Sequence, residues 1–171
     1  LADYGYREVG QEYLQNVLNT DKKLDAYDSG RIYYYLGDYQ KAYLALEEAK
    51  GKGGVDSYLY LGKAYAATGD YNYASSVYSN YLSKQGPDAE IYNQLGLCEL
   101  AKKDYQKALE AFQAGKQIEG NSLMQTLSFN EIVAYEYLQD YQKAAVLLKA
   151  YLQNYPDDQA AIREQQFLST R

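Results

Sequence analysis

Apolar and aromatic residues recur at helical spacing along the chain, and two such stripes are clearest within residues 55–88. The first stripe runs at i, i+3, i+4 and i+7 and consists of Tyr58, Leu61, Gly62 and Tyr65. The second runs at i, i+3, i+7 and i+10 and consists of Tyr71, Ala74, Tyr78 and Tyr81. Between the stripes, Gly69 is expected to end one helix in the left-handed conformation and Asp70 to cap the next. The pattern predicts a helical hairpin.

This hairpin pattern returns along the chain. Tyr39, Tyr71, Tyr105 and Tyr141 follow one another at steps of 32, 34 and 36 residues. Each is preceded by aspartate and followed by an alanine and then by a large apolar or aromatic residue: Asp38, Ala42, Leu46; Asp70, Ala74, Tyr78; Asp104, Ala108, Phe112; Asp140, Ala144, Leu148. Small residues such as Gly62 let the two helices of a hairpin approach closely. Because one hairpin cannot bury both of its faces, the hairpins are expected to stack on their neighbours.

The repeated positions resemble the tetratricopeptide repeat family. The resemblance rests on an aromatic residue, Leu-Gly, Tyr, Gly-Asp-Tyr, Ala, a second aromatic residue and a closing proline, which the unit from Val55 to Asp88 matches nearly throughout. It implies an all-α fold, a right-handed superhelical solenoid of stacked antiparallel helix pairs, as one domain over residues 1–171. Its predicted parts are an N-terminal helix or incoming half-repeat (1–22), four repeats (23–54, 55–88, 89–124, 125–158) and a C-terminal capping helix (159–171).

Several units depart from the family pattern. The third has Glu99 in place of the tyrosine and Lys103 in place of the turn glycine, and the fourth has Glu131-Ile132 in place of Leu-Gly. Wider or shifted helix packing is therefore expected in the fourth unit. In the terminal helix Gln165 and Gln166 fall on the Leu-Gly places, which predicts a polar, solvated face, with Asp157 or Asp158 near the helix start.

The N-terminal segment carries a strong helical stripe. It consists of Tyr6, Val9, Gly10, Tyr13, Leu14, Val17 and Leu18. Tyr6 lies 33 residues before Tyr39, so this segment corresponds to the second helix of an incomplete repeat. Its upstream face is expected to lack a covering helix.

Composition narrows the classes of function. With 17 basic and 23 acidic residues the formal net charge is −6, which disfavours binding to nucleic-acid phosphates. No apolar run approaches the roughly 20 residues of a membrane span. Histidine is absent, and the one cysteine, Cys98, is expected to be a small packing residue. The glycines at 51–54 are expected to form a linker between helices, not a phosphate loop. The sequence predicts a non-catalytic protein without cofactor or metal site.

The resemblance implies a concave groove, lined by the first helix of each pair, where an extended peptide or a partner helix docks. The predicted groove residues are Tyr27, Arg31, Tyr34, Tyr35, Leu59, Lys63, Asn93, Leu97, Phe129, Val133 and Tyr137. Tyrosine and arginine are typical binding hot spots, although the same residues also suit an ordinary amphipathic surface. Some relatives hold a C-terminal carboxylate at slots that are here Tyr27, Arg31, Tyr60, Glu90 and Gln94, and that clamp is not expected.

The leading hypothesis is a scaffold that binds a protein or peptide partner. The alternatives are an extracytoplasmic glycan or cell-wall binding module that uses surface tyrosines, and self-association through the N-terminal half-repeat. The chain begins at Leu1 and its one methionine is Met124. This fits an extracytoplasmic protein with a removed leader, with or without a lipid anchor, and it fits an excised piece of a cytoplasmic protein. We favour the extracytoplasmic reading slightly.

Overall fold

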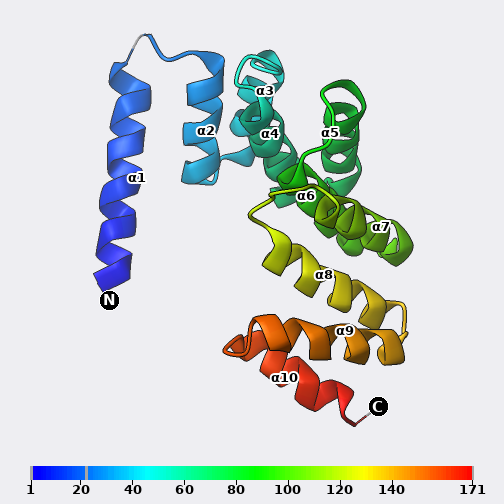
Figure 1. The fold of residues 1–171 in the computed structure, drawn as a ribbon. Helices are drawn as coiled ribbons and strands as arrows, with labels where there is room; N and C mark the ends of the chain where they lie inside the picture. Colours follow the sequence, from blue (N-terminus) through cyan, green and yellow to red (C-terminus); the bar gives the residue numbers. More distant parts are fainter. Residues whose placement is uncertain (1, 22, 171) are drawn as a thin grey trace. The chain divides into compact units, whose positions relative to one another are not determined.

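The computed structural model describes residues 2–21 and 23–170, with side chains from residue 8 onward (Figure 1). Over these residues it contains ten α-helices and no strand. They are α1 (Ala2–Thr20), α2 (Ala26–Leu36), α3 (Tyr39–Glu48), α4 (Val55–Ala67), α5 (Tyr71–Lys84), α6 (Ala89–Ala101), α7 (Tyr105–Lys116), α8 (Met124–Tyr137), α9 (Tyr141–Asn154) and α10 (Gln159–Leu168). The chain forms two compact units, residues 1–81 and 82–171, which divide within α5.

Consecutive helices form pairs inside each unit. In the first unit α2 contacts α3, α3 contacts α4, and α1 lies against α2. In the second unit α6 contacts α7, α7 contacts α8, α8 contacts α9, and α10 lies against α9. The prediction of an all-α fold built from helix pairs is therefore confirmed.

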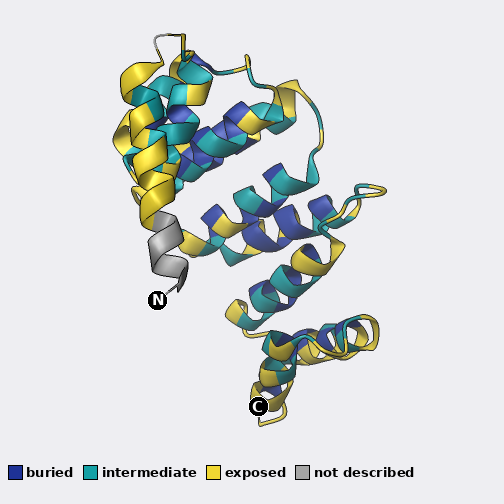
Figure 2. Ribbon diagram, turned by 90° about the vertical axis from the view of Figure 1, so that its left-hand side faces the viewer, coloured by how far each residue is buried: buried dark blue, intermediate teal, exposed yellow. Residues whose placement is uncertain are grey.

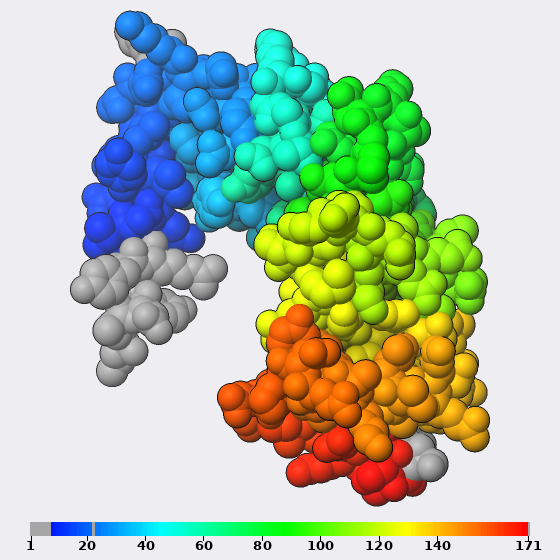
Figure 3. Space-filling model, viewed as in Figure 1, coloured from blue at the N-terminus to red at the C-terminus, as the bar shows by residue number. Residues whose placement is uncertain are grey.

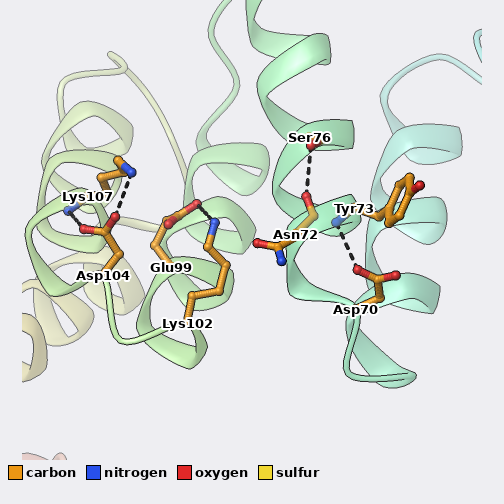
Figure 4. A network of polar contacts seen from close by, with 8 residues as sticks. All are labelled: Asp70, Asn72, Tyr73, Ser76, Glu99, Lys102, Asp104 and Lys107. Atoms are coloured by element: carbon orange, nitrogen blue, oxygen red, sulfur yellow. Dashed lines mark hydrogen bonds and ion pairs between the residues drawn. The ribbon is translucent and has the colours of Figure 1, made fainter.

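Short turns with an aspartate cap join the two helices of a pair. Gly69 has a φ of 83° and Asp70 accepts a hydrogen bond of 3.3 Å from the backbone N–H of Tyr73, as expected (Figure 4). Asp104 caps α7 in the same way, with 3.4 Å to the backbone N–H of Lys107 and 2.7 Å to its ammonium group. Each cap satisfies a backbone donor that the first turn of a helix leaves without a partner.

Two of these turns lack glycine and still take the left-handed conformation. Lys103 has a φ of 64° and Gln139 a φ of 62°. A side chain in this region crowds the backbone, which costs about 1 kcal/mol or more per residue. The caps and packing of the flanking helices hold both residues there. The following helix therefore begins at the same repeat position as in the pair whose turn has glycine.

Glycines on the first helix of three pairs accommodate a large side chain of the second helix. An added Cβ would lie 2.5 Å from the Leu46 side chain at Gly30, 2.3 Å from the Tyr78 ring at Gly62 and 2.3 Å from the Phe112 ring at Gly96. The three large partners have no exposed surface. The glycine thus provides room for a side chain of the opposing helix, and the close approach predicted from sequence is confirmed.

The fourth pair fills the same place differently. Ile132 stands where the other pairs have glycine, and it packs into an apolar cluster with Leu148, Ala144 and Tyr151. Its neighbour Glu131 is buried, with one carboxylate oxygen 2.6 Å from the ammonium of Lys116 and the other accepting 2.9 Å from the amide of Gln113. A buried carboxylate is tolerated here because both of its oxygens have partners. Wider helix packing in this pair stays a prediction.

The remaining packing expectations agree with the structure. Cys98 is buried, and burial raises the pKa of its thiol to about 11. The glycines at 51–54 lie in the turn region between α3 and α4. Asp158 caps α10 by accepting from the backbone N–H groups of Ala160 and Ala161, and the side chains of Gln165 and Gln166 are exposed.

Candidate functional site: a tyrosine–arginine cluster on α2 and α4

Helix α2 presents four of the predicted groove residues on one face. Asp25 caps the helix by accepting 2.8 Å from the backbone N–H of Asp28. From that start, residues 27, 31, 34 and 35 follow at i, i+4, i+7 and i+8, which places their side chains on one stripe of the helix. Tyr60 of α4 joins them from the next pair. We call these residues, Tyr27, Arg31, Tyr34, Tyr35 and Tyr60, the tyrosine–arginine cluster.

Arg31 is the centre of this cluster. Its guanidinium carbon lies 5.3 Å from the ring centroid of Tyr27 and 5.4 Å from that of Tyr60, within cation–π range of both. One guanidinium nitrogen is 3.7 Å from the Asp28 carboxylate, in a pair that is largely exposed. The Arg31 side chain is itself 40% exposed, so the two rings hold a cation in place while part of it still faces solvent.

The tyrosine rings support one another around Arg31. Tyr34, Tyr35 and Tyr60 make edge-to-face contacts with centroids 5.5 to 5.8 Å apart. The hydroxyl groups of Tyr35 and Tyr60 form a hydrogen bond of 2.6 Å. The backbone at Gly53 lies under the Tyr27 ring, where an added Cβ would be 2.7 Å from it. The side chains are therefore arranged by contacts within the first unit, before any partner is present.

The electrostatics of the cluster favour neutral phenols beside a permanent cation. Burial raises the pKa of Tyr27 and Tyr34, and the hydrogen bond to Tyr60 together with burial raises the pKa of Tyr35. At neutral pH these three phenols keep their protons and can donate as well as accept a hydrogen bond. The cluster can offer a cation, hydroxyl donors and aromatic edges to carbonyl or carboxylate groups of a partner.

The other two predicted groove residues of the first unit lie on α4. Leu59 and Lys63 are both half-buried. The backbone carbonyl of Leu59 accepts a hydrogen bond of 3.4 Å from the hydroxyl of Tyr78, so this part of α4 also anchors the core ring of its own pair. The chemistry of the first unit is concentrated at the tyrosine–arginine cluster.

The predicted residues of the second unit have diverse environments. Asn93 is 5% exposed, and its side-chain oxygen accepts 2.9 Å from the amide of Asn130, so it links α6 to α8 and offers little surface. Leu97 is 40% exposed, and Val133 is half-buried. Phe129 packs against the Tyr151 ring at 5.7 Å. Tyr137 is 55% exposed and stacks on Tyr105 at 4.9 Å.

Sequence reasoning missed two features of the tyrosines. Tyr60 was not among the predicted groove residues and was named only as a position of the carboxylate clamp. In the structure it contacts Arg31, Tyr34 and Tyr35. Tyr65 lies between Tyr43 and Tyr73, with ring centroids at 4.6 and 5.4 Å and nearly parallel planes. Burial, with the nearby charge of Glu47, raises the pKa of Tyr65 to about 12. Neither feature has a signal in spacing along one helix, because both join side chains of different helices.

Over the described residues, no cluster of three or more acidic or cysteine side chains is positioned to hold a metal ion. In the same part of the chain, no helix combines the length and the apolar character that crossing a membrane requires.

Comparison with known proteins places the chain in a family. Two family models described as Tetratricopeptide repeat match residues 59–122 and 129–158, together more than half of the chain. The helix pairs, their glycine contacts and these matches define one class of protein: the chain belongs to the tetratricopeptide repeat family. The recognition made from the repeat motif is thereby confirmed.

Individual relatives are more distant. Tetratricopeptide repeat protein 21B of Xenopus laevis is 28% identical over 153 residues, which is 88% of this chain and 10% of that protein. The chain therefore spans about a tenth of the length of this curated relative. A crystal structure of MamA protein superposes with a TM-score of 0.73 at 21% identity, covering 84% of this chain and 78% of the other. The second TPR domain of human RPAP3, in complex with the HSP70 peptide SGPTIEEVD, gives 0.58 at 16% identity, covering 64% and 90%. These two likenesses show the fold.

Proposed function

We propose that this chain is a protein-interaction module that binds a peptide or a partner segment along the first helices of its pairs, with the tyrosine–arginine cluster as the principal contact. The observation that carries the proposal is the arrangement of Arg31 between the rings of Tyr27 and Tyr60. A cation held by ring contacts loses little side-chain freedom on binding, and buried tyrosine and arginine dominate binding energies at many interfaces. Membership of a family of interaction modules supports the same function.

A peptide-binding experiment tests this proposal. The chain is immobilised and screened against a random peptide library, and the affinity of enriched peptides is measured by calorimetry. Arg31→Glu is expected to weaken binding by about 2 kcal/mol or more, roughly 30-fold, as for a hot-spot arginine. Tyr34→Ala is expected to weaken it less, because Arg31 keeps its contacts with Tyr27 and Tyr60.

Arg163→Glu is the matched control. Arg163 is exposed on α10, in the other unit, and the substitution changes the net charge of the chain by the same amount. Helicity by circular dichroism should be unchanged in all variants. Binding by Arg31→Glu and Tyr34→Ala that equals wild type would show that the cluster is not the contact surface.

The glycan-binding alternative predicts that the immobilised chain retains polysaccharide instead of peptide. Sugar rings stack on the free faces of aromatic side chains, but Arg31 lies over both the Tyr27 and the Tyr60 ring. The Tyr27 and Tyr60 rings should therefore not retain cell-wall polysaccharide on the immobilised chain. Retention that is lost in Tyr35→Ala, with no peptide enriched, would favour glycan binding instead.

A further inference from the structure

The second unit contains a pocket of about 240 Å³ lined by residues of α7, α8 and α9. Helix α8 lies against both other helices, and α8 and α9 are yellow and orange in Figure 3. The apolar lining includes Ile132, Leu147 and Tyr151, and buried residues of these helices are dark blue in Figure 2. Met124 and Asn154 line the pocket as well and are exposed, so the pocket has an entrance at the surface.

The repeat register identifies the side chain that fills this place in other pairs. Four residues before the contact glycine, the second pair has Tyr58 and the third pair has Tyr92. The fourth pair has Ser128 at this position, four residues before Ile132, and Ser128 lines the pocket. The pocket therefore lies where serine replaces a tyrosine ring of the repeat.

The residue that would receive this ring is still present in the fourth pair. In the second pair the Tyr58 ring contacts the Tyr81 ring edge-to-face, with 5.1 Å between centroids. Tyr151 has the position of Tyr81, because each lies ten residues after the first residue of its helix. Tyr151 is 4% exposed and lines the pocket. A ring that enters the pocket can make the contact with Tyr151 that Tyr58 makes with Tyr81.

The first and third pairs match these two positions to each other in size. The first pair has two small residues there, Ala26 and Ala49. The third pair has Tyr92 and Gly115, and an added Cβ on the glycine would lie 3.2 Å from the tyrosine Cβ. The fourth pair combines serine with tyrosine, so it keeps the receiving ring and lacks the ring that contacts it.

The size and the polar groups of the pocket fit a phenol ring. An apolar cavity of about 150 Å³ is enough to bind benzene, so this pocket has room for a ring with a substituent. Lys116 and Glu131, which pair at 2.6 Å, also line it. The ammonium can donate a hydrogen bond to a phenol oxygen, and the carboxylate can accept one from a phenol hydroxyl. The matching ligand is an aromatic ring with a hydroxyl group, as in a tyrosine side chain.

The entrance favours a ring that belongs to another protein. Met124 is 39% exposed there, and methionine is enriched at surfaces that bind proteins. A second copy of this chain is disfavoured because each copy carries a formal charge of −6. Its exposed Tyr35, Tyr73 and Tyr137 also have ring contacts of their own. Tyr13 is exposed too, and a dimer formed through it is one outcome of the test below.

We propose that the pocket between α7, α8 and α9 binds the side chain of a tyrosine on a partner protein. The incoming ring takes the place that Tyr58 and Tyr92 have in their own pairs. This site lies in the second unit, is separate from the tyrosine–arginine cluster and does not depend on the function proposed for that cluster.

Blocked amino acids test the proposal on the full ¹⁵N-labelled chain by NMR. N-acetyl-tyrosine amide is expected to shift resonances of the residues that line the pocket, with a dissociation constant on the order of 1 mM for a ligand of this size. N-acetyl-leucine amide should bind about 10-fold more weakly, because it lacks the ring contact and the hydroxyl group. p-Cresol, which is the tyrosine side chain without a backbone, should bind no more tightly than the blocked tyrosine.

Variants of the chain assign the binding to this pocket. Ser128→Tyr should abolish binding and raise the thermal midpoint, because its ring fills the cavity. Ala150→Phe, at an exposed position of the lining, should also block the pocket without changing a buried residue. Ser79→Tyr is the control, since it adds the same side chain at an exposed position of α5, and it should bind as wild type does. Arg31→Glu should also bind normally, which separates this site from the proposed function.

Four results would overturn the proposal. The first is no shift with the blocked tyrosine at several times the expected dissociation constant. The second is unchanged binding in both Ser128→Tyr and Ala150→Phe, because the ligand would then lie elsewhere. The third is binding of p-cresol without binding of the blocked tyrosine, which would make a free phenol the ligand. The fourth is a concentration-dependent dimer in sedimentation that Ser128→Tyr dissociates, since a second copy would then supply the ring.

Discussion

The second and fourth helix pairs form the same hairpin with different residues. In the α4–α5 pair, Gly62 accommodates the Tyr78 ring and Gly69 forms the turn. In the α8–α9 pair, Ile132 packs with Leu148, and Gln139 takes the left-handed turn conformation. The hairpin therefore depends on filling one volume between two helices. A ring against glycine and two branched side chains against each other are alternative ways of filling it.

The largest expected effect comes from a substitution at the glycine of the second pair. Gly62→Leu would place a side chain in the volume of the Tyr78 ring, which has no room to move because it is fully buried. We expect a loss of about 3 kcal/mol or more in the free energy of unfolding, measured by urea denaturation. Ile132→Val, at the corresponding position of the fourth pair, should cost only about 1 kcal/mol, because it removes one methylene from a filled site. Equal losses in the two variants would contradict the comparison.

The next effect concerns Glu131, which stands where the second pair has Leu61. Glu131→Leu restores the family residue, yet we expect it to destabilise the chain by about 1–3 kcal/mol, because it leaves the Lys116 ammonium without its partner at 2.6 Å. Adding Lys116→Met should recover most of this loss, since the double variant replaces a partly buried ion pair with apolar contacts. Urea denaturation of the two single variants and the double variant measures the coupling. A stabilising Glu131→Leu would show that the ion pair has no role in this position.

A pH effect should distinguish the fourth pair from the second. Burial, together with the charge of Glu164, raises the pKa of Glu136 to about 7, whereas the second pair has Ala66 at this slot. The folded chain therefore holds a proton that the unfolded chain releases near its ordinary pKa of 4.5. The contribution of Glu136 to stability is fully present below this lower value and is lost, by about 1 kcal/mol or more, as the pH rises to 7.

Glu136→Gln tests the assignment, because glutamine resembles the protonated acid and does not titrate. The variant should unfold at nearly the same urea concentration at pH 5 and pH 7.5, while wild type should be less stable at the higher pH. Glu119→Gln, on an exposed turn residue, is the control and should keep the wild-type pH dependence. An unchanged pH dependence in Glu136→Gln would assign the titration to another group.

The smallest effect is at the turns. Gln139→Gly should stabilise the chain by about 0.5–1 kcal/mol, because relief of crowding at positive φ exceeds the added flexibility of the unfolded chain. Lys103→Gly should act in the same direction, and Gly69→Gln in the opposite one. Thermal midpoints in one buffer compare the three variants. A destabilising Gln139→Gly would mean that the glutamine side chain makes a contact that outweighs the strain.

The helix pairs were predictable because they depend on residues close together in sequence. The spacing of Tyr58, Leu61 and Gly62, the turn glycine and the aspartate cap are local signals, and each has the expected role in the structure. Four members of the tyrosine–arginine cluster were also predictable, since they share one stripe of α2. Tyr60 was not, because its contacts cross from α4 to α2. The inward position of Asn93 depends in the same way on Asn130, 37 residues away.

The helices, their caps, the repeat period and the glycine slots follow from the sequence alone, because they are set by backbone hydrogen bonding and by side-chain size over distances of a few residues. The tertiary structure was needed to show which tyrosines surround Arg31 and which join the stack of Tyr43, Tyr65 and Tyr73. Those outcomes depend on which helix lies opposite each side chain. A repeat motif specifies an apolar helix face, and the neighbouring helices determine whether that face is buried.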